Sequence, residues 1–260
     1  MQRPRLVRID FNPQELADLL QRGVQPTVVL DPDTAHHIVR VLRLAVGAPL
    51  IAATKSGGAS FHALLVDRDP ATIQIIRHSA NERWIGRVSV LIVGAIRGNR
   101  LDWICEKATE LCLEQLWVVQ SARSEPHALS PQRQNRLERL AGAATEQSTN
   151  LNPPSIRFFE SLEAVLLELK DHAGVRSLMS LAPHAEPMRQ LKIGADDSLI
   201  IAVGPEGDFD DRELHLLLGA GFTPTSLGPV VLRVETAVLA SIAAANALWG
   251  FRQLSSAPIS

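Results

Sequence analysis

The stretch "IIAVGPEGD" at residues 200–208 decides the fold, because an apolar run passes directly into a turn that holds one acid between two glycines. Such a run predicts a buried strand, and the glycines after it let a ligand approach the backbone closely. The glycines lack the lysine of a nucleoside-triphosphate loop, and their spacing differs from the dinucleotide fingerprint. Because the acids of "DFDD" at 208–211 would repel a polyanion, we expect a neutral or cationic ligand; a tight turn with a surface acid is the alternative.

Strand and helix patterns alternate around this stretch from residue 87 onward. Apolar runs predict strands at 87–96, 114–121, 154–159, 176–182, 198–204 and 224–232. Apolar spacing of three and four residues predicts helices at 99–113, 130–148 and 161–171, with further helices beginning at Asp210 and Val234. Regular alternation of this kind predicts an α/β domain around a largely parallel sheet, which we place at residues 81–256.

The first 80 residues show a different pattern, with short strands predicted at 27–31, 48–54, 59–69 and 71–78. "KSGG" at 55–58 gives a hairpin signal, and "DTAHHIVRVLRL" at 33–44 predicts the one helix. Residues 79–86 read as a linker. The pattern predicts a small β-barrel domain at residues 1–80.

Composition and charge limit the class of protein. The 260 residues are 46% hydrophobic and 21% charged, which is typical of a globular protein, and no targeting or membrane-spanning segment is expected. Cys105 and Cys112 lie seven apart in one helical pattern, so both are expected on one side as reduced core thiols of a cytoplasmic protein. No metal-ligand spacing is present, and no metal is expected.

The net charge of −2 is unevenly distributed. Residues 1–78 hold 9 basic and 7 acidic side chains, whereas residues 151–260 hold 8 basic and 13 acidic ones. Arginines also occur in tight groups in the first half, which allows a local RNA-binding surface; solvated helix faces are the alternative for each group.

A second apolar run, "LGPVVLRVETA" at 227–237, follows soon after the first and leads into an alanine-rich helix. Small residues at 237, 240, 244 and 247 let another backbone pack closely on this helix. The pattern favours a close dimer or knot contact, or an ordinary helix-on-sheet contact.

The two motifs together resemble those of the SPOUT methyltransferases, and more closely those of the ribosomal RNA small subunit methyltransferase E family. The resemblance covers essentially the whole chain in order, through "RPRL" (3–6), "HHIVRVLRL" (36–44), "RLDWICEKATEL" (100–111), Arg123 after "QSA", and "ATEQS" (144–148). It implies an N-terminal PUA-like RNA-binding barrel, a C-terminal domain with a deep trefoil knot, and a homodimer. It also implies S-adenosylmethionine as cofactor and methylation of ring nitrogen 3 of a uridine in 16S rRNA of the small ribosomal subunit, without membrane partners.

The resemblance also implies the residues of the site. Cofactor contacts are expected from Leu181, Ala182, Pro183, Gly204, Glu206, Gly207, Leu227, Gly228, Val230 and Leu232. Arg233 is expected to stabilise charge on the uracil or to orient RNA, and Glu235 to act as an acid or base or in a dimer contact. RNA contacts are expected from Arg5, Arg40, Arg43, Arg97, Arg100 and Arg123.

The chain departs from the family at four positions. Asn150 and Val230 stand where the family usually has arginine, and Cys112 and Asp208 where it usually has glycine. These departures leave two alternatives open: a non-catalytic RNA-binding relative, or a SPOUT enzyme acting on another rRNA or tRNA nucleotide.

Overall fold

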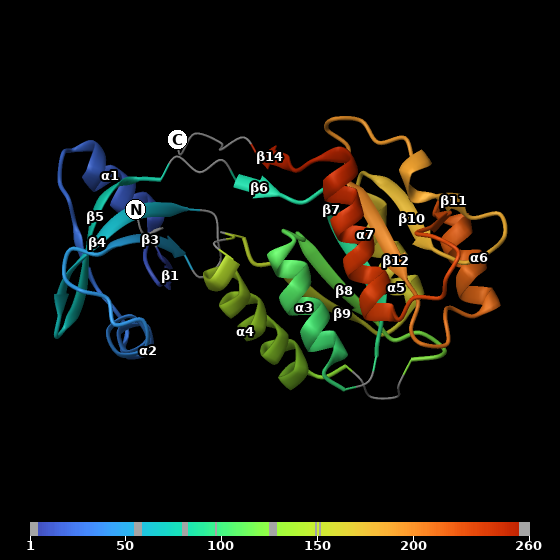
Figure 1. The fold of residues 1–260 in the computed structure, drawn as a ribbon, viewed down its shortest axis with the longest axis horizontal. Helices are drawn as coiled ribbons and strands as arrows, with labels where there is room; N and C mark the ends of the chain where they lie inside the picture. Colours follow the sequence, from blue (N-terminus) through green and yellow to red (C-terminus); the bar gives the residue numbers. More distant parts are fainter. Residues whose placement is uncertain are drawn as a thin grey trace. The chain divides into compact units, whose positions relative to one another are not determined.

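The computed structural model describes residues 5–54, 59–79, 83–96, 98–124, 129–148, 150 and 152–254. The chain divides into two compact units (Figure 1). The described residues of the first lie within Met1–Arg83, Thr145–Asn152 and Leu254–Ser260, and those of the second within Trp84–Ala144 and Pro153–Gln253. The predicted hairpin at 55–58 lies outside the described residues.

A seven-stranded sheet forms the centre of the second unit, and its described strand pairs are all parallel. The strand order is β11-β13-β10-β12-β7-β8-β9. The strands are β7 (Val88–Gly94), β8 (Gln115–Val119), β9 (Ser155–Phe159), β10 (Val175–Met179), β11 (Glu186–Pro187), β12 (Leu199–Val203) and β13 (Thr223–Ser226). The predicted α/β fold with a mostly parallel sheet is confirmed, although residues 227–232 leave the sheet after β13.

Helices cover both faces of this sheet (Figure 1). They are α3 (Arg100–Glu110), α4 (Pro131–Ser148), α5 (Leu162–Glu168), α6 (Asp211–Gly219) and α7 (Val234–Trp249), with short 3-10 turns at Leu169–Asp171 and Met188–Gln190. Along β12, Leu199 and Ile201 pack with α3 and α7, whereas Ile200 packs with α5 and α6. A strand buried on both faces needs an unbroken apolar run, which explains why "LIIAV" at 199–203 shows no alternation.

Side-chain caps fix where the helices begin. Ser130 Oγ accepts a hydrogen bond from Arg133 N at 3.2 Å and so caps the start of α4. Asp210 and Glu213 form a capping box at the start of α6. None of the helices in the described ranges combines the length and the hydropathy that crossing a bilayer requires.

The first unit contains a five-stranded sheet of order β1-β3-β4-β5-β2. Its strands are β1 (Arg5–Ile9), β2 (Thr27–Val29), β3 (Pro49–Thr54), β4 (Ser60–Arg68) and β5 (Ala71–His78). Its helical segments are α1 (Pro13–Gln21), α2 (Pro32–His36) and a π-helical turn, η1 (His37–Val41). Phe61, Leu65 and Ile73 are fully buried in its core.

The structure differs from the expectations for the first unit and its borders in four ways. Strand β1 and helix α1 were not predicted, and the expected helix at 33–44 is instead α2 followed by the π-helical turn. The expected linker contains a strand, β6 (Arg83–Ile85), which pairs with β14 (Arg252–Leu254). Residues 145–152 group with the first unit, where Arg8 Nε donates to Thr145 Oγ1 at 2.8 Å.

The two cysteines do not share one helix face. Helix α3 ends at Glu110, and Cys112 follows it with a φ of 60°. Cys105 is fully buried, and burial raises the pKa of its thiol to about 12. Cys112 is only half-buried, although burial raises its pKa as well.

Candidate functional site

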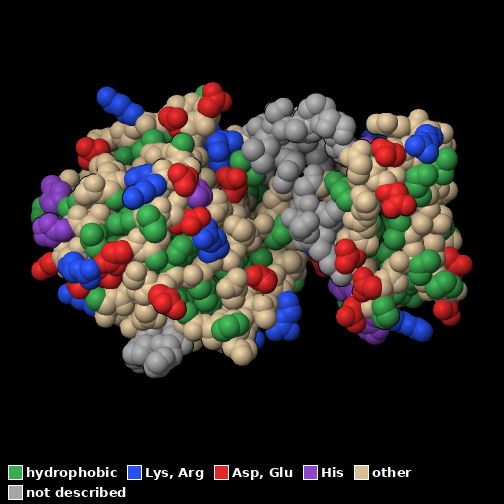
Figure 2. Space-filling model, turned by 180° about the vertical axis from the view of Figure 1, so that it is seen from behind, with side chains coloured by type: hydrophobic (Ala, Val, Ile, Leu, Met, Phe, Trp, Pro, Cys, Tyr) green, Lys and Arg blue, Asp and Glu red, His purple; other side chains and the backbone are tan. Residues whose placement is uncertain are grey.

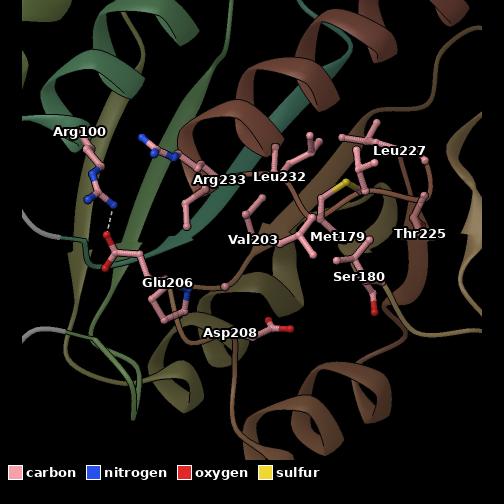
Figure 3. A pocket seen from close by; sticks show the side chains of 18 residues that line it. Arg100, Met179, Ser180, Val203, Glu206, Asp208, Thr225, Leu227, Leu232 and Arg233 are labelled. Carbon is pink, nitrogen blue, oxygen red and sulfur yellow. Dashed lines mark hydrogen bonds and ion pairs between the residues drawn. The ribbon is translucent and has the colours of Figure 1, made fainter.

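A cavity of about 630 Å³ opens beyond the carboxyl ends of three neighbouring strands, β13, β10 and β12 (Figure 3). The residues after each of these strands line it, together with the start of α7 and Arg100 at the start of α3. Ligands of open parallel sheets bind at this edge, because the loops that follow the strands converge there. The cavity also has the size of a small-molecule or cofactor site.

The walls of the cavity are largely apolar. Met179, Val203 and Leu227 come from the strand ends and the residues that follow them, and Leu232 precedes α7 (Figure 3). The polar lining residues include Ser180 and Thr225, which carry hydroxyl groups. A flat apolar group can therefore pack against the apolar walls, and a few polar groups are available for hydrogen bonds.

The turn at 204–208 packs so tightly that its first position admits only glycine. A Cβ on Gly204 would lie 2.5 Å from Asp208 Oδ1 and 2.9 Å from Phe209 N. Asp208 N donates to Pro205 O at 2.8 Å, which closes the turn. Gly204 is therefore required for the conformation of the turn.

Charged side chains gather at one side of this turn. Arg100 and Glu206 form a hydrogen-bonded ion pair, and both side chains are about half exposed (Figure 3). Arg123 Nη1 donates to Gly207 O at 2.5 Å. Arg100 and Arg123, both expected to contact RNA, therefore bind the turn at 204–208, which lines the cavity.

A buried carboxylate, which the sequence reasoning missed, fixes the loop that carries Arg123. Glu213 accepts from Ala122 N at 2.8 Å and from Asp210 N at 2.9 Å, although it is only 6% exposed. The acid three residues after Asp210 gives a capping-box signal in the sequence, but its bond to Ala122 depends on the tertiary fold.

Seven of the ten residues expected to contact the cofactor line the cavity: Leu181, Gly204, Glu206, Leu227, Gly228, Val230 and Leu232. Ala182, Pro183 and Gly207 belong to the same loops but are not among its lining residues. The other liners were not predicted as cofactor contacts, although Asp208 and Ala237 stand out in the sequence for other reasons: Met179, Ser180, Val203, Pro205, Asp208, Thr225, Val231, Val234 and Ala237. Several of these are apolar strand-end residues, which sequence alone assigns to the core.

The two residues expected to be catalytic lie differently. Arg233 precedes α7, is exposed and lines the cavity. Glu235 lies in the first turn of α7 and does not line the cavity. Its Oε2 atom is buried and has no hydrogen-bond partner among the residues that the structure describes.

Three of the other expected RNA contacts lie in the first unit. Arg5, Arg40 and Arg43 are all exposed there, and Arg43 has a φ of 52°. Arg97 lies outside the described residues. On the face of the larger unit drawn in Figure 2, basic and acidic side chains are interspersed, as on an ordinary solvated surface. Across the described ranges, no cluster of three or more His, Cys, Asp or Glu side chains could hold a metal ion.

Comparison with known proteins identifies the family. A family model described as an RNA methyltransferase domain matches residues 87–246. Ribosomal RNA small subunit methyltransferase E of Bacillus subtilis is 27% identical over 233 residues, which are 84% of this chain and 89% of the relative. The protein of the same name from Synechocystis is 29% identical over 86% of this chain and 74% of the relative.

Solved structures agree with this assignment. A probable rRNA-methyltransferase from Porphyromonas gingivalis has a TM-score of 0.72 and 27% identity, covering 94% of this chain and 98% of its own. The fold also matches a ribosomal RNA small subunit methyltransferase E from Neisseria gonorrhoeae, solved with S-adenosylmethionine bound. That structure has a TM-score of 0.78 and 22% identity, and the match covers 95% of this chain and 98% of that one. The chain therefore belongs to the RNA methyltransferase family, and its resemblance to the ribosomal RNA small subunit methyltransferase E family is confirmed.

Proposed function

We propose that the protein transfers a methyl group from S-adenosylmethionine to ring nitrogen 3 of a uridine in 16S rRNA. The observation that carries the proposal is the cavity beyond β13, β10 and β12, which brings the loop at 204–208 together with the loop at 227–233. The match of residues 87–246 to the RNA methyltransferase domain supports the reaction class. The names of the relatives support the small-subunit RNA as substrate.

The residues of the cavity fit the cofactor. A volume of about 630 Å³ lies in the range of cofactor sites, and the apolar walls suit an adenine ring. The loop at 227–233 would contact the cofactor through Leu227, Gly228, Val230 and Leu232. The loop at 204–208 would contact it through Gly204 and Glu206, and the segment after β10 through Leu181. Ala182, Pro183 and Gly207 would act through the conformation of these loops.

When bound, S-adenosylmethionine supplies an activated methyl group on a sulfonium, so the protein provides orientation and electrostatics. The imide nitrogen of uracil is a poor nucleophile until its proton leaves, and negative charge then develops on the ring oxygens. Arg233 would stabilise this charge, because its exposed guanidinium lines the cavity. Glu235 would accept the proton or form a dimer contact, since its unpartnered Oε2 can accept a hydrogen bond.

The wider arrangement proposed here follows the family. The first unit would bind RNA as a PUA-like barrel through the exposed Arg5, Arg40 and Arg43, with Arg97, Arg100 and Arg123 contributing from the second. The second unit would contain the trefoil knot and form a homodimer through the alanine-bearing helix α7. We propose that the homodimer acts in the cytoplasm.

The test is transfer of radiolabelled methyl from S-adenosylmethionine to small subunits that lack the modification, followed by mass spectrometry of the nucleosides. The expected product is 3-methyluridine, and Arg233→Ala is expected to lower its rate of formation at least tenfold. A different methylated nucleoside would reject the uridine target and favour the alternative SPOUT activity. RNA binding without transfer would favour the non-catalytic alternative, which the exposed Val230 motivates.

A further inference from the structure

We propose that Asp208 makes the cavity select the positively charged methyl donor over the product, whose sulfur is neutral. This inference rests on the proposed function and names the residue that sets the preference. Loss of the methyl group converts the sulfonium to a thioether and removes one positive charge, so a nearby carboxylate distinguishes donor from product.

The Asp208 carboxylate is held in a fixed position at the cavity. Asp208 lines the cavity, and its Oδ1 accepts a hydrogen bond from Phe209 N at 2.8 Å. The same oxygen lies 2.5 Å from the place where a Cβ of Gly204 would be. The carboxylate therefore lies against a residue that has no side chain, and its position is set by the turn.

The backbone at Asp208 has a conformation that costs energy for a residue with a side chain. Its φ of 62° lies in the left-handed region, where glycine is favoured and other residues are uncommon. Aspartate tolerates this region better than most side chains, but glycine would remove the strain altogether. Strain kept at the wall of a cavity is a reason to look for a function of the side chain.

The other charged side chains of the cavity leave Asp208 with an unmatched negative charge. Arg100 and Glu206 neutralise each other as an ion pair. Figure 3 shows the Arg233 guanidinium directed toward the side of Arg100, away from Asp208. Within the described part of the chain, no ion pair involves Asp208.

A sulfonium group is stabilised by a nearby negative charge such as the Asp208 carboxylate. It has no N–H or O–H group to donate, so negative potential is the principal means by which the cavity can favour it. Donor and product are otherwise the same molecule, with the same ammonium, carboxylate and adenosine. Asp208 is exposed to water, which weakens its field, so the difference in charge is expected to change the affinity ratio only about three- to tenfold.

The experiment is titration calorimetry of the full chain with S-adenosylmethionine and with S-adenosylhomocysteine, for the wild type, Asp208→Asn and Asp208→Gly. Asparagine keeps the acceptor for Phe209 N and tolerates the left-handed backbone, and glycine removes both side chain and strain. The matched control is Asp211→Asn, which neutralises an exposed acid that does not line the cavity.

Both Asp208 variants are expected to lower the ratio of donor to product affinity about three- to tenfold, while the control leaves it unchanged. The wild-type ratio is also expected to fall as salt is raised, and the variants' ratios to stay constant. If both ligands bind and neither Asp208 variant changes the ratio, Asp208 does not select the donor and the proposed function stands. If neither ligand binds the wild type, the proposed function fails and this inference with it.

Discussion

Gly94 lies against the ring of Pro205, so closely that a Cβ on Gly94 would come 2.6 Å from Pro205 Cδ and 2.7 Å from Pro205 N. Gly94 ends β7, and Pro205 follows β12, which pairs with β7 through Val203 and Val93. The missing side chain at 94 therefore sets how closely the turn at 204–208 approaches the end of the sheet. Part of the wall of the cavity depends on a residue that does not line it.

Gly94→Ala is expected to displace the turn and to weaken binding of S-adenosylmethionine at least tenfold. Overpacking of this kind costs about 1–3 kcal/mol in the free energy of unfolding, which urea denaturation would measure alongside calorimetry. The control is Gly142→Ala in α4, where a Cβ would meet no atom within 4 Å. Unchanged affinity in Gly94→Ala would mean that the turn has room to move without loss of the site.

Within the part of the chain that the structure describes, the buried Arg87 guanidinium donates only to backbone carbonyls. The acceptors are the carbonyl oxygens of Gly194, Ala195, Asp197, Trp249 and Gly250. Arg87→Lys keeps the charge but cannot reproduce the planar set of donors. We expect a loss of about 2–4 kcal/mol in the free energy of unfolding, measured by urea denaturation.

Arg212→Lys is the matched control for Arg87→Lys. The Arg212 side chain is 76% exposed and pairs with Glu163. Exposed ion pairs contribute little, so this change is expected to alter the free energy of unfolding by less than about 0.5 kcal/mol. Equal effects of the two substitutions would show that the carbonyl contacts of Arg87 add no stability.

Cys112 occupies a position at the end of α3 where glycine is usual. Leu113 N donates to Ala108 O and Cys112 N to Thr109 O, both at 3.0 Å, which is the Schellman pattern of a helix end. With a φ of 60°, Cys112→Gly should relieve strain, whereas Cys112→Ala removes the thiol and keeps the strain.

The glycine variant is therefore expected to be about 1 kcal/mol more stable than the alanine variant, compared by thermal or urea unfolding. The comparison isolates the backbone, because neither variant has the thiol. An alanine variant as stable as the glycine variant would show that the left-handed conformation costs nothing here.

The sequence predicted the second unit well because its strands are buried on both faces. The unbroken apolar run at 199–203 predicts either a buried strand or a buried helix, and its short length favours a strand. Segments whose secondary structure depends on tertiary contacts were not predicted. The three-residue strand β6 is too short to show a period, and it exists because β14 pairs with it.

The residues of the candidate site also divide into those with a local sequence signal and those without one. Gly204 and Gly228 stand out in the sequence because glycine interrupts apolar runs, and both line the cavity. Met179 and Thr225 carry no local signal, and only the parallel order β13-β10-β12 brings them together. The left-handed backbone of Asp208 was likewise not predicted, since an aspartate in a turn is compatible with several conformations.

Glu146 has a pKa above the ordinary 4.5, because burial disfavours its charged form. The positive charges of His37 and Arg8 and a hydrogen bond from the backbone of Arg8 oppose this shift only in part. The folded state therefore binds the proton more tightly than the unfolded state. The resulting stabilisation is complete below pH 4.5 and is lost as the pH rises through the raised value.

Relative to Glu146→Gln, the wild type should thus lose stability as the pH rises above about 4.5, and the difference should become constant above the raised pKa. Urea denaturation of the wild type and each variant between about pH 2 and pH 7 would measure this. Glu168 provides a control of opposite sign, because its hydrogen bond from Arg157 lowers its pKa. Its contribution is present above pH 4.5 and is lost as the pH falls through the lowered value, so Glu168→Gln should change the pH dependence in the other direction. A pH dependence of the same sign for both substitutions would contradict the assignment of burial as the dominant influence on Glu146.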